Sequence, residues 1–316
     1  MARRETETAF GQQINNHWCL PVYHWPQGDA FIEHDILTSY DASSLFTNAP
    51  LEETIQILSN NAFAENWFNV TYNLNISRDD LVTLLWVATK HQIFQFNGSL
   101  YEQIAGVAMG SPPEPLMANA FICSIEAKLE RENKLPYFYK RCVDDTLAVV
   151  RDIPTATVFF ATLNKEHSSI NFTIEVAINS KLPFIGMELM KMGGQVRTCV
   201  YGKTTDKGLL LHYQSHVHNT YKRSLLTTML NRAHRISSSS DLFAAECDNL
   251  KEIFLKFKYP KRLINSTITR FNESQDRKQV HDIQVNKPVR ITLPFEDQRS
   301  ADLVRRQLAL RSPEEK

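Results

Sequence analysis

The chain has 316 residues, of which 43% are hydrophobic and 22% charged, and its 35 Lys and Arg balance its 35 Asp and Glu. This composition is typical of a globular protein that buries a sizeable core, and it excludes long disorder, collagen and coiled coil. No window approaches the ~18 to 20 consecutive apolar residues of a membrane-spanning helix, and the first ten residues lack the apolar core of a signal peptide. We therefore expect an intracellular protein with no membrane segment.

The N-terminal part predicts a strand, a tight turn and a helix. Residues 1–30 show neither helical nor strand periodicity, so we expect an irregular segment there. Residues 36–46 (ILTSYDASSLF) predict a strand. Pro50 stands where a first helical residue belongs, and Glu52 and Glu53 favour the positive end of the helix that follows.

A second helix and a first hairpin follow. The run from Ser77 to Asp80 has the spacing of an acidic capping box and predicts a helix over 81–92. Asn97 and Gly98 tolerate positive φ, which suits the two-residue turn of a hairpin. The elements expected from here are strands at 93–96 and 99–105, a loop at 106–115 and a helix at 115–132.

A second hairpin displays an acidic pair. Two β-prone runs, 137–142 and 146–150, flank Val143, Asp144 and Asp145, which places the two carboxylates at the hairpin tip. A helix at 155–167 and three strands at 170–177, 182–190 and 195–202 are expected next. Through residue 202 the pattern predicts an α+β body around an antiparallel sheet.

The charge is distributed unevenly along the chain. Residues 1–200 hold 14 Lys and Arg against 22 Asp and Glu, a net charge of −8, whereas residues 201–316 hold 21 against 13, a net charge of +8. Two helices are expected in the basic part, at 221–236 and 241–259, followed by a strand at 289–295 and a helix at 300–311. An acidic body joined to a basic extension fits a metal-binding body with a polyanion-binding appendage, although solvated helix faces produce the same split.

Three features in chain order point to one chemistry. They are Asp41 near a strand end, the run GVAMGSP at 106–112, and the pair Asp144 and Asp145. Each alone is typical of a cap or a solvated turn. Together they match in-line phosphoryl transfer, in which carboxylates hold two divalent ions about 3.5 to 4 Å apart. Phe46 would then lie under the incoming sugar, and the alternative is an ordinary core phenylalanine.

Longer blocks carry a family resemblance. The segment SYDASSLFTNAPLEETI resembles the first catalytic block of Penelope-like retroelement reverse transcriptases, FNGSLYEQIAGVAMGSPPEPLMANAF their substrate-binding block, and KRCVDDTLAVV their metal-binding block. LNKEHSSINFTIE and KLPFIGMEL resemble the two palm blocks that follow, and residues 204–239 are similar to the thumb side of that family. The resemblance covers roughly residues 32–307, and such an ordered series of blocks is specific.

The resemblance implies an RNA-directed DNA polymerase with a right-hand fold. It implies that Asp41, Asp144 and Asp145 bind two Mg²⁺ or Mn²⁺ ions and that Phe46 acts as the sugar gate. Gly110, Ser111 and Pro112 would line the template and nucleotide pocket, with Cys142 beside the primer. The implied partners are an RNA template with a DNA primer and deoxynucleoside triphosphates, in a nuclear setting. The expected domains are an irregular remnant at 1–30, a palm at 31–202, a basic thumb-like helical region at 203–275 and a connector at 276–316.

The chain also departs from that family. Cys142 replaces an aromatic residue before the acidic pair, and Pro113 and Glu114 stand where the family has glycine. A carboxylate at position 114 would repel nucleotide phosphates unless it turns away. The family's fingers should precede Asp41 by well over a hundred residues, and an endonuclease of GIY-YIG type usually follows the polymerase. We therefore expect a truncated copy or a partial gene model, with Lys165 as a weak candidate for gripping the triphosphate.

Basic residues of the C-terminal part are candidates for contacts with the backbone of a template-primer duplex, the alternative being a solvated helix face. They are Lys222, Arg223, Arg232, Arg235, Lys256, Lys258, Lys261 and Arg262. His212, His216, His218 and His234 have spacing that suits a metal, but no cysteine or carboxylate completes a zinc-like set. Five scattered cysteines without a CxxC pair predict reduced thiols. Two alternatives to an active enzyme stay open: an inactive nucleic-acid-binding remnant, and a relic without a molecular role.

Overall fold

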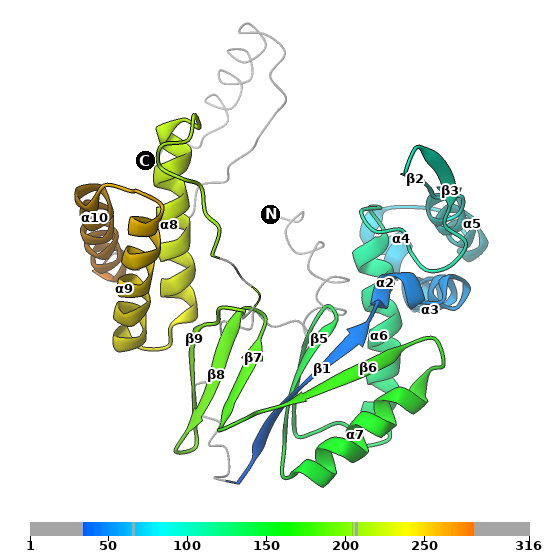
Figure 1. Ribbon diagram of the computed structural model, residues 1–316. Coiled ribbons are helices and arrows are strands. Elements are labelled where there is room, and N and C mark those ends of the chain that lie inside the picture. The colour runs from blue at the N-terminus through cyan, green and yellow to red at the C-terminus, as the bar shows by residue number, and fades with distance from the viewer. Residues whose placement is uncertain (1–33, 65–66, 204, 206–207, 281–316) are drawn as a thin grey trace, which may run out of the picture. The chain divides into compact units, whose positions relative to one another are not determined.

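The computed structural model describes residues 34–64, 67–203, 205 and 208–280. The irregular segment expected at 1–30 lies outside this range, and so do the strand and helix expected at 289–295 and 300–311. The described residues form an α+β fold whose sheets are antiparallel (Figure 1). The chain divides into two compact units, residues 1–268 and 269–316.

The central sheet has four strands in the order β4-β5-β1-β6. These strands are β1 (Ile36–Ser43), β4 (Phe138–Cys142), β5 (Asp145–Val150) and β6 (Asn171–Val176). Each adjacent pair is antiparallel. Because side chains alternate between the two faces of a strand, each strand sends every second residue to the same side of this sheet.

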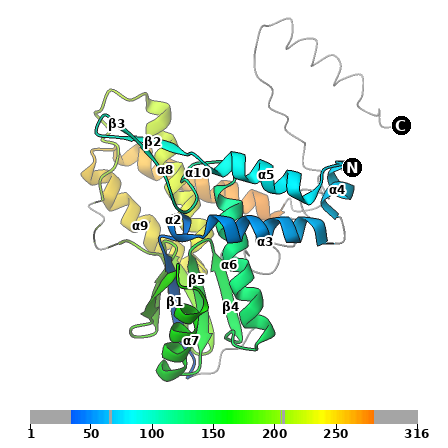
Figure 2. The same ribbon diagram turned by 90° about the vertical axis from the view of Figure 1, so that its right-hand side faces the viewer.

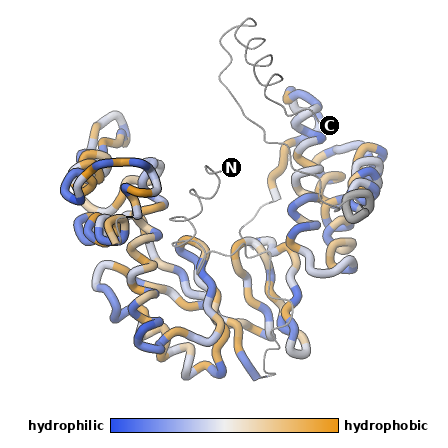
Figure 3. Tube along the Cα trace, turned by 180° about the vertical axis from the view of Figure 1, so that it is seen from behind, coloured by the Kyte–Doolittle hydropathy of each residue, from blue (hydrophilic) through white to orange (hydrophobic). Residues whose placement is uncertain are grey.

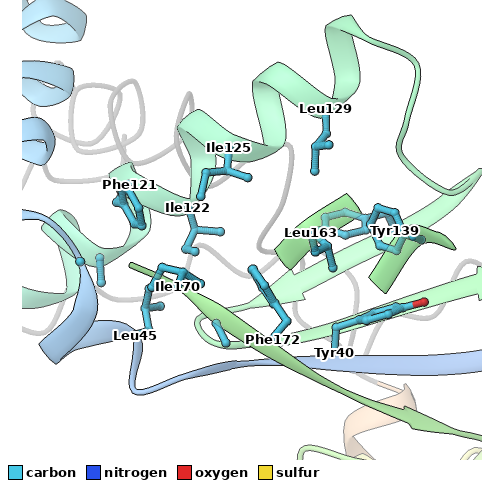
Figure 4. Packing of buried hydrophobic residues seen from close by; sticks show 14 of the residues in the cluster. Tyr40, Leu45, Phe121, Ile122, Ile125, Leu129, Tyr139, Leu163, Ile170 and Phe172 are labelled. Atoms are coloured by element: carbon cyan, nitrogen blue, oxygen red, sulfur yellow. The ribbon is translucent and has the colours of Figure 1, made fainter. Parts of the chain in front are cut away.

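Two helices cover one face of the central sheet (Figures 1 and 2). They are α6 (Glu114–Arg131) and α7 (Ile153–Glu166), and Asp152 caps α7 by accepting a hydrogen bond from the Thr155 amide at 2.8 Å. Tyr40 of β1 and Phe172 of β6 point into the core beneath them (Figure 4). In Figure 3 hydrophobic residues recur along the strands and these helices, as a core between sheet and helices requires.

A second sheet has the order β7-β8-β9, with β7 (Lys181–Phe184), β8 (Met187–Met192) and β9 (Gln195–Val200). The prediction of one strand over 182–190 is wrong, because the chain reverses at Ile185 and Gly186, whose φ angles are 45° and 72°. Apolar residues of this sheet pack on Leu37, Leu147 and Val149 of the central sheet. The central sheet is therefore covered on part of its second face as well.

The strand expected over 36–46 is too long. It ends at Ser43, because Ser44 takes a left-handed conformation with φ 51° and the short helix α2 (Leu45–Asn48) begins. Phe46 therefore lies on a helix. The following helix, α3 (Leu51–Phe63), is confirmed, with Pro50 just before its first residue and Glu52 and Glu53 in its first turn.

The capping box and the hairpin turn between residues 77 and 98 are confirmed, whereas the helix at 67–72 was not expected and the strand expected at 99–105 ends at residue 102. After α4 (Trp67–Tyr72), the helix α5 (Arg78–Thr89) begins with the expected capping box, in which the Ser77 and Asp80 side chains each bond the other's amide. Asn97 and Gly98 have φ angles of 48° and 82° and join β2 (Ile93–Phe96) to β3 (Ser99–Glu102). A two-residue turn of this hand matches the twist of a hairpin.

Three helices form the basic part: α8 (Asn219–Ile236), α9 (Ser240–Lys256) and α10 (Lys261–Val280). The first two were expected, whereas α10 was not named from the sequence. The unit boundary after Ile268 falls inside α10. Leu226, Leu230 and Ala233 are buried on α8, as its apolar stripe predicts. Within the described residues, no helix combines the length and apolarity needed to cross a membrane.

Candidate functional site

Pairing of the central strands brings the predicted aspartates together. Asp41 of β1 lies directly opposite Asp145 of β5, and the Ala42 amide donates a 3.1 Å hydrogen bond to the Asp144 carbonyl. Cys142 of β4 pairs with Asp145, and Thr173 of β6 pairs with Asp41. Since paired residues share a face, Cys142, Asp145, Asp41 and Thr173 form one row across all four strands. We call this the aspartate row.

Burial and neighbouring carboxylates disfavour the ionisation of Asp41 and Asp145. Burial raises the pKa of Asp41, and the neighbouring charge of Asp144 raises it further. Burial also raises the pKa of Asp145, with further increases from Asp144 and Asp41 and a partial offset from Lys203. Repulsion between clustered carboxylates is the usual electrostatic state of a cation site without its cation.

The aspartate row opens onto a pocket of about 660 Å³. Its polar lining includes Asp41, Asp145 and Lys203, and the turn of Ile185 and Gly186 forms part of its wall. The remaining lining residues are Ser39, Thr173, Ile174, Glu175, Pro183, Phe184, Tyr201 and Thr205. This pocket lies on the face of the central sheet opposite α6 and α7, because Tyr40 and Ala42 of β1 point to those helices and Asp41 does not.

The donor chemistry of the aspartate row suits a hard divalent cation. Carboxylate oxygens are the ligands that Mg²⁺ prefers, and a cation would offset the burial and the repulsion that raise the pKa values of Asp41 and Asp145. In their present conformations, however, no three His, Cys, Asp or Glu side chains of the described residues converge closely enough to hold a metal ion. The backbone brings the aspartates together, and their side chains would have to rotate to share an ion.

The predicted sugar gate, Phe46, is partly buried against the central core. Its carbonyl accepts a 2.7 Å hydrogen bond from the Val107 amide, which ties α2 to the GVAMGSP loop. At Gly106 a Cβ would overlap the backbone carbonyl of Thr47, and φ is +69°. Only glycine fits there, so the first glycine of the loop is explained by its close approach to α2.

The predicted pocket residues Gly110, Ser111 and Pro112 line a separate cavity of about 680 Å³. Thr47 of α2, Ala88 of α5 and Ile93 and Phe94 of β2 complete its wall, together with Gln92 and Gln103 beside the hairpin and Ala108 and Met109 of the loop. The aspartate row is not part of this lining. The sequence blocks are therefore linked through α2, which carries Phe46 and Thr47, rather than by one shared cavity.

Glu114 turns away from open solvent. Its side chain accepts a hydrogen bond from the Gly110 amide, and only 9% of the residue is exposed. It stands in the first turn of α6, where a negative charge is favourable. The carboxylate that departs from the family pattern thus stabilises the loop and the start of α6.

Most predicted basic contacts are exposed, with one correction. Lys222 is only 4% exposed, because its ammonium donates to the Ser215 carbonyl at 2.7 Å and lies over the Tyr213 ring. A buried ammonium cannot reach a phosphate, so the assignment of Lys222 to a duplex surface is wrong. Arg232 donates to the Gly186 carbonyl at 3.2 Å and so links α8 to the wall of the aspartate pocket. The exposed residues are Arg223, Arg232, Arg235, Lys256, Lys258, Lys261 and Arg262.

The histidines and Lys165 lie outside the aspartate row. His212 and His218 each accept a backbone hydrogen bond through Nδ1, and among the described residues the histidines join no metal-binding group. Lys165 is exposed in the last turn of α7, on the side of the sheet away from the aspartate row. Among the described residues, Cys123, Cys142, Cys199 and Cys247 form no disulfide.

One group near the site was missed in the sequence. Arg141 of β4 is buried beneath the acidic hairpin and pairs with Glu126 of α6. The alternation of residues in β4 places Arg141 on the core face, and this pattern was present in the sequence. It was overlooked because a basic residue beside an acidic pair is also typical of an exposed charge.

Comparisons with known proteins give limited similarity. The model of a family described as the animal helix-turn-helix domain matches residues 209–269. Apo telomerase from Candida tropicalis is 9% identical over 87% of this chain and 46% of its own, with a TM-score of 0.45. Telomerase from Candida albicans, in complex with a TWJ fragment of telomeric RNA, is 11% identical over 80% of this chain and 50% of its own, with a TM-score of 0.42.

A Candida tropicalis telomerase truncated from its C-terminal domain is 13% identical over 51% of this chain and 35% of its own, with a TM-score of 0.38. The chain thus spans between 35% and 50% of the length of these three structures. No curated protein matches it in sequence.

Proposed function

We propose that this chain is the reverse transcriptase core of a Penelope-like retroelement, an RNA-directed DNA polymerase that extends a DNA primer on an RNA template. In this proposal the central sheet is the palm and the helices α8 to α10 belong to a thumb-like region. The observation that carries the proposal is the aspartate row. Two sequence blocks about a hundred residues apart meet in it. Asp41 lies opposite Asp145, and the amide of the next residue, Ala42, donates a hydrogen bond to the Asp144 carbonyl.

The role of the aspartates would be to hold two divalent ions, Mg²⁺ or Mn²⁺, which supply activation of the primer 3′ oxygen and neutralise the leaving pyrophosphate. The raised pKa values of Asp41 and Asp145 support this role, since these carboxylates gain most from a bound cation. Lys203, in the same pocket, offers a positive charge that a phosphate group would contact.

Other residues would shape the substrate site. In this proposal Phe46 selects a deoxyribose; its side chain packs partly against the core, and the bond from the Val107 amide to its carbonyl fixes its backbone. The Gly110 amide donates to the Glu114 carboxylate, so part of the charge of Glu114 is balanced within the loop. Gly110, Ser111 and Pro112 would then contact the template and the nucleotide.

Primer extension on an RNA template tests the proposal. The full chain is assayed with Mg²⁺ and then Mn²⁺, alongside the variant D144N/D145N. Loss of two metal-binding carboxylates should reduce extension by about 10³-fold or more, because the ions supply several kcal/mol of transition-state stabilisation. The matched control is Asp152→Asn, which replaces an aspartate of the next element by another good capping residue.

Extension by wild type and Asp152→Asn but not by D144N/D145N is the expected result. Extension that survives in D144N/D145N would exclude the aspartate row as the catalytic site. No extension by wild type with either metal would reject the enzyme proposal for this chain.

A second candidate function is binding of nucleic acid without catalysis. It is favoured by the exposed basic residues of α8 to α10 and by the match of residues 209–269 to a helix-turn-helix model. In this case affinity for an RNA–DNA duplex should fall steeply with salt and be the same in D144N/D145N as in wild type. Affinity that does not change between low and high salt would contradict this function.

A further inference from the structure

A buried ion pair lies behind the acidic hairpin. The Arg141 and Glu126 side chains are each 1% exposed. Arg141 Nε donates to Glu126 Oε1 at 2.6 Å and Nη2 donates to Oε2 at 2.9 Å, which is a bidentate contact. Tyr139 also donates to Glu126 Oε1, at 2.8 Å. The pair therefore fixes the guanidinium plane in one orientation.

The remaining arm of Arg141 reaches the turn. Nη1 donates to the Val143 carbonyl at 2.9 Å, while Nη2 also donates to Asn119 Oδ1 of α6 at 2.9 Å. Arg141 pairs with Thr146 across the hairpin, one position from the pairing of Cys142 with Asp145. Since neighbours along a strand face opposite sides, Arg141 lies on the α6 side and the aspartate row on the pocket side.

The held turn is strained. Val143 has a φ of 61°, in the left-handed region that a β-branched residue rarely adopts. Such a conformation persists only where surrounding contacts determine it. The Val143 carbonyl is held on one side by Arg141, and the next carbonyl, that of Asp144, accepts from the Ala42 amide.

We propose that Arg141, oriented by Glu126 from α6, is a positioning residue that holds the Val143–Asp144 turn and thereby fixes Asp144 and Asp145 against Asp41. The inference rests on the proposed function only where it says that the turn positions metal-binding aspartates. The contacts of Arg141 with the turn do not depend on that function. A buried ion pair is a costly way to gain stability, because desolvation offsets much of the attraction. The pair can, however, orient the Val143 carbonyl, which apolar residues of equal size could not do.

The variant that tests this is the double substitution Arg141→Met/Glu126→Gln in the full chain. It removes the arm to Val143 without leaving an unpaired buried charge, and the amide oxygen of the introduced glutamine still accepts from Tyr139. The matched control is Leu129→Ala, a fully buried residue on the same helix that contacts the core and not the turn. Leu129→Ala lowers stability without touching the guanidinium.

The direct readout is hydrogen exchange of the Ala42 amide, whose bond to the Asp144 carbonyl reports the position of the turn. The double variant should raise its exchange rate by about tenfold or more, and Leu129→Ala should not do so at matched distance from the melting temperature. Equal exchange in the double variant and in Leu129→Ala would overturn the inference. If the double variant does not fold, Arg141→Lys replaces it, since a lysine paired with Glu126 has no second arm for Val143.

The second readout is Mn²⁺ affinity measured by electron paramagnetic resonance. The double variant should bind Mn²⁺ about tenfold or more weakly than Leu129→Ala, because its aspartates are no longer held in register. Unchanged affinity together with unchanged exchange overturns the inference. If exchange is faster only in the double variant but wild type binds no Mn²⁺ through Asp145, positioning of the turn is supported and the proposed function is the part that fails.

Discussion

Asp41 and Asp145 lie directly opposite each other on adjacent strands, and burial together with carboxylate repulsion raises the pKa of both. This arrangement works against stability unless a cation or a proton compensates it. The stability of the fold should therefore depend on pH and on divalent ions at this one place.

Asp145→Asn should stabilise the metal-free protein at pH 7. A folded-state pKa above the ordinary 3.8 means that the folded state holds its proton more tightly than the unfolded state, so stability falls as pH rises above about 4. The gain should stay below ~1 kcal/mol, because Asp145 is partly exposed and solvent screens the repulsion. Urea unfolding at pH 4 and pH 7 in chelator measures it, and the gain should shrink at pH 4.

Asp152→Asn is the control for that measurement. A hydrogen bond from Thr155 lowers the pKa of Asp152, so this substitution removes an aspartate whose charge is favoured in the folded state. A comparable gain at pH 7 in this control, or a loss of stability in Asp145→Asn, would contradict the prediction.

Mg²⁺ should stabilise wild type and not D144N/D145N. A ligand that binds only the folded state contributes about 1.4 kcal/mol when its free concentration is ten times Kd. Thermal unfolding over a Mg²⁺ titration at constant ionic strength measures the effect. Equal stabilisation of both proteins would show that the ion binds elsewhere.

Gly106→Ala should destabilise the fold by roughly 2 to 4 kcal/mol. The added Cβ would overlap the backbone of Thr47, and the positive φ adds strain. Gly110→Ala is the control, since φ there is also positive but no atom lies within 4 Å of its Cβ. It should cost only about 1 kcal/mol. Urea unfolding distinguishes the two, and equal losses would refute the close approach of the loop to α2.

Lys222→Met should change the stability of the fold, whereas Arg223→Ala should change the binding of nucleic acid. Loss of the buried bond to Ser215 should cost about 1 to 3 kcal/mol of stability and leave the salt dependence of duplex binding unchanged. Arg223 is exposed, so its removal should leave stability unchanged. It should lower the slope of log affinity against log salt by up to about 0.9. Fluorescence anisotropy across a salt series measures both slopes, and a changed slope in Lys222→Met would be the contrary outcome.

Phe46→Val should weaken selection against ribonucleotides if the chain is a polymerase. A smaller side chain leaves room for the 2′-hydroxyl, and a pocket that excludes one group by shape discriminates by about 10- to 100-fold. The ratio of kcat/KM for deoxyribonucleotide and ribonucleotide measures the change. The matched control is Phe172→Leu, a residue of β6 in the same core cluster. Selectivity lost equally in both variants would point to general loosening of the core.

Local signals in the sequence determined many elements of this fold. The capping box of Ser77 and Asp80, the turn of Asn97 and Gly98 and the apolar stripe of α8 each depend on residues a few positions apart, so they can be recognised without tertiary information. The β4–β5 hairpin, with its acidic pair at the tip, was predictable for the same reason.

Tertiary structure decided the contacts between distant residues. The reversal at Ile185 and Gly186 was missed because a β-branched residue gives no turn signal and a single glycine in a strand pattern also fits a bulge. The burial of Lys222 depends on Ser215 and Tyr213, which contact it. The pairing of Asp41 with Asp145 and the support of their turn by Arg141 and Glu126 join four segments of the chain. Strand register and side-chain packing set these relationships, and neither is encoded by spacing along the sequence alone.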